Sequence, residues 1–209
     1  DLVNATLSGS SGPLGRPLSM LTFALNYYVA GFDPVYFKLT NVLIHLLCGA
    51  AVYFLAFQVL RAAQGPARDG AIAQAQWLGA VIASVWLVHP LNLTSVLYVV
   101  QRMTSLSAGF SFLAVGLYVL GRRKLLQGES PRGLLLIFLA LVPVCALGAF
   151  SKENALLSPI LMLAAELVFF RFATDNPAIG KRLAMAVAIL AMLALVGLAL
   201  NADRIVSYV

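Results

Sequence analysis

Charged side chains are scarce in this sequence. Only 11% of its 209 residues are Asp, Glu, Lys or Arg, whereas soluble domains carry about a quarter. Hydrophobic residues make up 61% of the chain. So little charge excludes an ordinary soluble domain and predicts an integral membrane protein in a lipid bilayer. The net charge is +6. In a membrane protein, an excess of Lys and Arg usually marks cytoplasmic loops, so this charge does not suggest nucleic-acid binding.

Residues and motifs of several enzyme chemistries are also missing. The sequence has two histidines and two cysteines, and it contains no GxxxxGK[ST] loop, no GxGxxG fingerprint, no HExxH and no GxSxG. Nucleotide-driven and zinc chemistry therefore have no support. Cys48 and Cys145 lie in apolar stretches without metal or redox spacing, and we expect small buried apolar residues there.

Six apolar stretches are long enough to be membrane spans, which need about 20 residues. They predict an all-α integral membrane protein, a bundle of about six transmembrane helices. The stretches run approximately over residues 38–60, 71–88, 104–120, 133–150, 155–170 and 183–200.

A further helix is expected before the first span. Pro17 lies where a first helical turn would begin, Gly31 lies where a helix would end, and apolar residues recur at helical spacing between them. We predict an interfacial helix within 16–31, along the extracytoplasmic membrane surface. The chain then divides into an extracytoplasmic loop with this helix, residues 1–37, and a transmembrane bundle, residues 38–209, which we expect to be a fragment of a larger core.

The basic residues divide into two groups by topology. Three polar connections, 61–70, 121–133 and 171–182, follow alternate spans and carry nine of the fourteen basic residues. By the positive-inside tendency, their side of the membrane is the cytoplasm. Topology explains these nine residues, but it does not explain the five cations that it places at outer span ends: Arg16, Lys38, Arg102, Lys152 and Arg204.

A polar stripe marks the outer end of the first span. Lys38, Asn41 and His45 follow the spacing i, i+3, i+7 and share one helix face. A polar face inside a span should contact protein or water rather than lipid. The stripe is either a hydrogen-bonded seam between helices or part of a binding site. Both interpretations stay open for Asn41 and His45, and for Lys38, at the outer mouth, we favour a site.

The segment HPLNLTSVLYVVQRMTS, residues 89–105, interrupts the apolar pattern. Pro90 ends the second span after His89, and Arg102 falls at the outer mouth of the third span. The planar donors of arginine match a pair of phosphate oxygens, so we predict a phosphate contact. The alternative for Arg102 is snorkelling to lipid headgroups. His89 is either a hydrogen-bonding helix terminator or a site ligand, and a metal would need further ligands.

The segment SKENALLSP opens the fifth span with charged residues. We expect Ser151 to cap this helix, so that its free N–H groups and Lys152 attract an anion. Glu153 either complements the helix dipole or orients Lys152 or a substrate hydroxyl. Deeper in the span, Glu166 lies close to Arg171 in the sequence, and it is expected to pair with a basic residue or to snorkel.

Three stretches carry a family resemblance over residues 15–170. In chain order they are GRPLSMLTFALNYYVAGFDPVYFKLTNVLIHLL, HPLNLTSVLYVVQRMTSLSA and SKENALLSP. Together they resemble membrane regions of the GT-C glycosyltransferase superfamily. The likeness is to protein O-mannosyltransferase-like enzymes and to bacterial members with C-terminal tetratricopeptide repeats.

This resemblance implies transfer of a sugar from a polyprenyl-phosphate donor, without another cofactor, to an acceptor protein or glycan. In the family a carboxylate takes the acceptor proton and basic residues stabilise the departing lipid phosphate. Arg16, Lys38, Arg102 and Lys152 match the second role. The family's catalytic acid lies in the first outer loop, and we expect it outside this sequence. We also expect a bacterial inner membrane, with the site facing the periplasm.

Two other functions are compatible with the same helices. A non-catalytic membrane subunit would use them to dock partner proteins, and an acidic pair encoded upstream would argue against that function. An anionic-lipid transporter would be expected to show inverted repeats and broken helices near mid-membrane. The sequence has no such repeat, and its polar groups lie at the outer boundary.

Overall fold

A computed structural model describes residue 6 and residues 15–64, 70–174 and 177–200. Every regular element in these ranges is a helix, and six helical segments are long and apolar enough to cross a membrane. The predicted all-α membrane fold is therefore confirmed. Arg68, Arg204 and most of the predicted loop before Gly15 lie outside the described residues. The elements are α2 (Pro17–Ala30), α3 (Pro34–Ala63), α4 (Ala71–Val88), η1 (Pro90–Asn92), α5 (Leu93–Leu97), η2 (Val99–Gln101), α6 (Arg102–Leu126), α7 (Ser130–Leu139), η3 (Ala140–Val144), α8 (Cys145–Ser151), η4 (Glu153–Leu157), α9 (Ser158–Ala165), η5 (Glu166–Phe170) and α10 (Pro177–Leu200).

The first span begins earlier than its apolar stretch because two residues start the helix. Asp33 Oδ1 accepts a 2.9 Å hydrogen bond from the Val35 N–H, and Pro34 occupies the first helical turn. The 30 residues of α3 span about 45 Å, against a hydrocarbon core of about 30 Å. The helix α3 is therefore longer than the hydrocarbon core is thick, and we expect its first turn to extend beyond that core.

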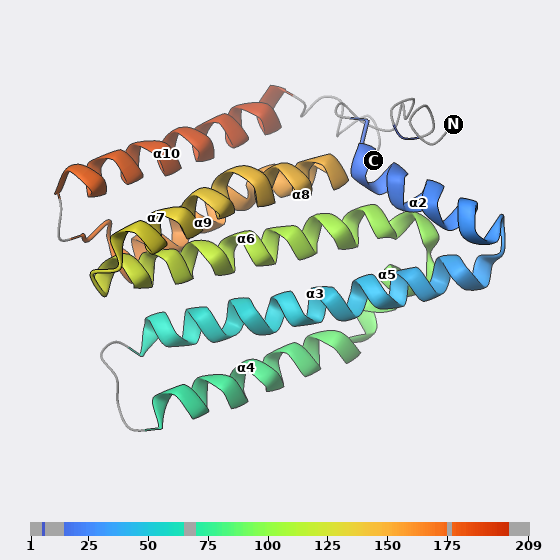
Figure 1. Ribbon diagram of the computed structural model, residues 1–209, viewed down its shortest axis with the longest axis horizontal. Coiled ribbons are helices and arrows are strands. Elements are labelled where there is room, and N and C mark those ends of the chain that lie inside the picture. Colours follow the sequence, from blue (N-terminus) through green and yellow to red (C-terminus); the bar gives the residue numbers. More distant parts are fainter. Residues whose placement is uncertain (1–5, 7–14, 65–69, 175–176, 201–209) are drawn as a thin grey trace.

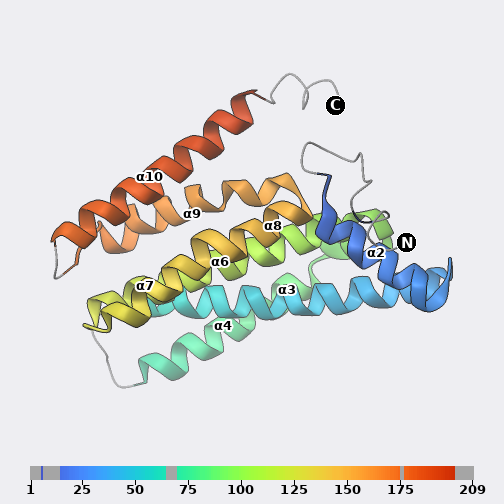
Figure 2. The same cartoon turned by 45° about the horizontal axis from the view of Figure 1, so that its top comes forward.

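Two long helices form the centre of the bundle (Figure 1). α3 packs against α6, and α4 packs on α3, while α7, α8 and α9 pack on α6 and α10 lies against α9. α2 crosses one end of the bundle, where it contacts α3, α6 and α8 (Figure 2). We call this the α2 end. The helix ends joined by the three predicted cytoplasmic connections all lie at the opposite end.

Small residues let the helices approach closely, as is common in membrane bundles. A Cβ added to Gly121 of α6 would lie 2.9 Å from the carbonyl oxygen of Gly133 of α7. Cys48 and Cys145 are buried and unpaired by a disulfide, which confirms the prediction that they act as small core residues. Close backbone contact thus fixes how α6 packs against its neighbours.

We expect Gly121→Ala to lower the unfolding temperature in detergent, because the added methyl group meets the backbone of α7. At an open helical position, alanine would instead be more favourable than glycine by about 1 kcal/mol. Gly79→Ala is the matched control, since a Cβ there lies 3.5 Å from its nearest neighbours, an ordinary contact. Equal unfolding temperatures for the two variants would contradict the close α6–α7 packing.

Candidate functional site

Arg102, the first residue of α6, is fully buried and bonded to two other helices of the α2 end. Its Nε donates to Asn41 Oδ1 of α3 at 2.8 Å. One terminal nitrogen donates to Asn26 Oδ1 and, at 3.1 Å, to the Thr22 carbonyl, both on α2. The other donates to the Phe37 carbonyl of α3 at 2.9 Å. The guanidinium therefore joins α2, α3 and α6 through neutral acceptors.

Aromatic rings and Asn41 complete the surroundings of this cation. The rings of Phe23 and Phe37 lie 4.7 and 5.5 Å from the guanidinium carbon, within cation–π range. The Asn41 amide nitrogen donates to two carbonyls of the α5–η2 segment, at 3.3 and 3.2 Å. Asn41 thus contributes to a seam between helices. The described donors of Arg102 all point at protein acceptors. Its contact with a phosphate stays a prediction.

We expect Arg102→Ala to destabilise the protein and to detach α2. The substitution removes the donor to the buried Asn41 Oδ1, at about 1–3 kcal/mol, and the bonds to three part-buried acceptors. Thermal unfolding in detergent and amide hydrogen exchange in α2 would measure the loss. Arg132→Ala is the control, because the Arg132 side chain is 81% exposed in its ion pair with Glu129. Protection of the α2 amides equal to that of the control would overturn this role.

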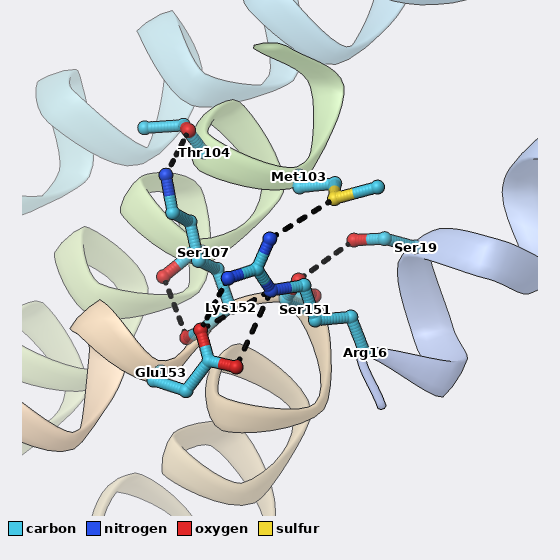
Figure 3. Close-up of polar contacts among 8 residues, drawn as sticks. All are labelled: Arg16, Ser19, Met103, Thr104, Ser107, Ser151, Lys152 and Glu153. Carbon is cyan, nitrogen blue, oxygen red and sulfur yellow. Dashed lines mark hydrogen bonds and ion pairs between the residues drawn. The ribbon is translucent and has the colours of Figure 1, made fainter. Parts of the chain in front are cut away.

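An ion pair connects the N-terminus of α2 to the start of η4 (Figure 3). Arg16 Nε lies 3.3 and 3.2 Å from the two carboxylate oxygens of Glu153, and Arg16 Nη2 lies 2.9 Å from one of them. The remaining nitrogen donates to the Met103 sulfur at 3.7 Å, a weak acceptor. The two charged side chains are 22% and 23% exposed. The pair is therefore reachable from outside the bundle.

Lys152 lies beside this pair, but its ammonium group bonds a neutral partner. Its Nζ donates to Thr104 Oγ1 of α6 at 2.8 Å, and within the described ranges it forms no ion pair. Burial and the positive charge of Arg16 lower the pKa of the Lys152 ammonium, while the Glu153 carboxylate acts in the opposite direction. Two cations face one acid, so this group of residues suits an anionic ligand. We call it the α2-end cluster: Arg16, Met103, Thr104, Lys152 and Glu153.

The backbone that carries Lys152 and Glu153 is fixed by two hydroxyl groups (Figure 3). Ser19 Oγ of α2 donates to the Ser151 carbonyl at 2.9 Å, and Ser107 Oγ of α6 donates to the Lys152 carbonyl at 3.2 Å. Ser151 itself is the last residue of α8, and its Oγ donates back to a carbonyl of that helix at 2.9 Å. The predicted N-cap role of Ser151 is therefore wrong, because the preceding helix already binds its hydroxyl.

The remaining predicted residues make their contacts elsewhere. Lys38 is exposed near the start of α3. His45 is buried, with Nε2 2.9 Å from the Leu87 carbonyl and its ring stacked on Trp86 at 5.0 Å between centroids, so it joins α3 to α4. His89 is exposed after α4, and its Nδ1 accepts a 3.3 Å hydrogen bond from the backbone N–H two residues later. That contact is typical of a helix terminator.

Sequence reasoning named the charged members of the α2-end cluster and missed the hydroxyl groups that contact them. A lone serine or threonine in an apolar span gives no sequence signal of the partner that it will meet. The missed residues are Ser19, Thr104 and Ser107. The structure brings Arg16, Lys152 and Glu153 together in one cluster. It joins Asn41 of α3 to Arg102 of α6 in a separate network, which also includes Asn26 of α2.

A second buried charge network lies at the opposite end of the bundle. Glu166 pairs with Arg122 of α6, and both side chains are fully buried. The Tyr118 hydroxyl and the Phe172 N–H donate to the same carboxylate, at 2.8 and 3.0 Å. The expected pair of Glu166 with a basic residue is confirmed. Its partner is Arg122 of the neighbouring helix rather than the nearby Arg171, which is exposed and has a left-handed backbone after the π-helical η5.

Comparison with known proteins finds distant relatives. Protein O-mannosyl-transferase Tmtc1 of Drosophila melanogaster is 33% identical over 154 residues, 74% of this chain and 15% of that protein. Tmtc2 of the same organism is 30% identical over 152 residues, 72% of this chain and 14% of that protein. Protein O-mannosyl-transferase TMTC4 of Homo sapiens is 34% identical over 110 residues, 51% of this chain and 15% of that protein.

No family model and no solved structure matches the chain. The matched segments span only 14% or 15% of the length of these three relatives. The chain is therefore a distant homologue of proteins named as protein O-mannosyl-transferases, over a small part of their length.

Proposed function

We propose that this chain is part of a membrane glycosyltransferase that moves a sugar from a polyprenyl-phosphate donor to an acceptor at the extracytoplasmic face. The observation that carries the proposal is the α2-end cluster, which assembles two cations and one acid from segments far apart in sequence. The names of the distant relatives support sugar transfer and make mannose and protein hydroxyl groups the first donor and acceptor to test. The concentration of Lys and Arg at the opposite end supports an extracytoplasmic α2 end.

In the proposed reaction, the acceptor oxygen attacks the anomeric carbon of the donor sugar. The bond between that carbon and the phosphate oxygen breaks, and the acceptor proton passes to a carboxylate that we place in the longer protein. The lipid phosphate leaves with one more negative charge than it had in the donor. Cations at the phosphate therefore bind the transition state more strongly than the donor, which lowers the barrier.

Arg16 and Lys152 are the residues that we assign to phosphate contact. Both have charged groups at the bundle end, and the Arg16 side chain is 22% exposed. Lys152 Nζ has one described partner, the Thr104 hydroxyl, so an ammonium has donors left for a ligand. Lys38, exposed near the start of α3, is assigned to attraction of the anionic headgroup.

Arg102 is assigned a positioning role in this proposal. Its guanidinium holds α2 against α3 and α6. The position of α2 in turn places Arg16, the residue before it, in the cluster and brings Ser19 to the Ser151 carbonyl. Asn41 holds α3 against α5, the short helix after α4, and His45 holds α3 against α4. His89 shapes the turn after α4.

We expect Arg16→Ala and Lys152→Ala, each in the full-length protein, to reduce sugar transfer by about 10²-fold, the usual effect of removing one donor to developing negative charge. The measurement is transfer of labelled mannose from polyprenyl-phosphate mannose to an acceptor protein in isolated membranes, normalised to the amount of inserted protein.

Lys124→Ala is the matched control, because Lys124 pairs with Glu129 at the opposite end, at 2.7 Å. Its transfer should equal that of the parent. Transfer at the control level by both cluster variants would remove Arg16 and Lys152 from the site. Absence of transfer by the parent protein, with donor and acceptor present, would favour a non-catalytic membrane subunit.

A further inference from the structure

The backbone of Arg16 is held in an unfavourable conformation. Its φ of 51° and ψ of 48° are left-handed, a region that residues with a Cβ rarely adopt. Arg16 is the N-cap residue of α2, and its side chain makes no capping hydrogen bond to this helix. Such strain persists where surrounding contacts determine the conformation. The described contacts of Arg16 are the hydrogen bond that its carbonyl accepts from the Met20 N–H and the side-chain contacts with Glu153 and the Met103 sulfur.

The Arg16–Glu153 pair has the properties of an exchangeable contact. Both side chains are more than one fifth exposed, and solvent-accessible ion pairs contribute little to stability. The fully buried pair of Arg122 and Glu166 differs, because water and ligands cannot reach it. An anion that approaches the α2 end can therefore compete with Glu153 for the guanidinium, with a small loss of ion-pair energy.

The charges beside the pair favour such an exchange. Lys152 offers its ammonium group without an acid of its own, and its one described side-chain partner is the Thr104 hydroxyl. A phosphate between Arg16 and Lys152 would contact two cations, whereas Glu153 forms its ion pair with Arg16. The planar guanidinium accommodates two phosphate oxygens as it accommodates two carboxylate oxygens.

We propose that Glu153 occupies the phosphate position on Arg16 in the empty site, and that a lipid phosphate displaces it when the donor binds. This inference rests on the proposed function and adds a regulatory contact to the same site. No covalent bond changes: the guanidinium exchanges one pair of oxygen atoms for another, and the Glu153 carboxylate is released beside Lys152. Glu153 is then a competitor of the substrate, and in the empty site it neutralises the charge of Arg16.

The exchange predicts that Glu153→Gln strengthens phosphate binding and that the gain requires Arg16. Farnesyl phosphate is the probe, titrated into the full-length protein in detergent, with farnesol as the reference without a phosphate. We expect Glu153→Gln to bind the probe about threefold to fivefold more tightly than the parent, from the size of a part-exposed ion pair. Glu129→Gln, which removes the same charge at the opposite end, should leave the dissociation constant unchanged.

A double-mutant cycle separates displacement from simple repulsion. In an Arg16→Gln background, Glu153→Gln should give no gain, because no guanidinium remains for the two anions to share. An Arg16→Lys background keeps the charge without the planar pair of donors, and Glu153→Gln should there give a smaller gain in probe affinity. This background covers the case in which Arg16→Gln loosens α2. A full gain in both backgrounds, or no gain in the parent background, would overturn the exchange while leaving the phosphate site in place. If the parent binds farnesyl phosphate no better than farnesol, both the phosphate site and the exchange are refuted.

Discussion

The geometry of the α2 end depends on one buried guanidinium. Arg102 has no exposed surface, and its described hydrogen-bond partners are amide and carbonyl oxygens of α2 and α3. A charge buried in this way is tolerable only if its donors are satisfied. The requirement fixes the relative positions of three segments at once, since a displacement of α2 would remove acceptors from a fully buried cation.

The candidate site follows from the position of α2. Once α2 lies across the bundle end, its first turn brings Arg16 to Glu153 and Ser19 to the Ser151 carbonyl, while α6 supplies Thr104 and Ser107 from the other side. The buried network therefore positions the cluster, and the part-exposed cluster stays available to a ligand. This division between a buried support and a reachable charge is expected of a binding site in which rigid elements hold the contacting groups.

The opposite end solves the same electrostatic problem in another way. There the buried cation Arg122 has a buried acid, Glu166, and Tyr118 and a backbone N–H also donate to the carboxylate. Burial of both partners makes the pair a structural connection between α6 and η5, because a charge inside a membrane protein needs an opposite charge or a polar group beside it. The two ends thus differ in how they hold a buried cation: one pairs Arg122 with a buried acid, and the other surrounds Arg102 with neutral acceptors.

The sequence by itself determined the fold class, the approximate spans and the location of the unusual cations. Long apolar runs can satisfy their backbone only as helices in lipid, so composition and run length suffice for these features. It also placed Asn41, Arg102, Lys152 and Glu153 near the ends of spans, where their polarity stands out. Tertiary structure alone decided the pairings: Arg102 with Asn26 and Asn41, Arg16 with Glu153, and Glu166 with Arg122 rather than Arg171. Helical periodicity gives the face on which a side chain lies, but the partner depends on which helix packs there, and close approach of small residues at helix interfaces sets that packing.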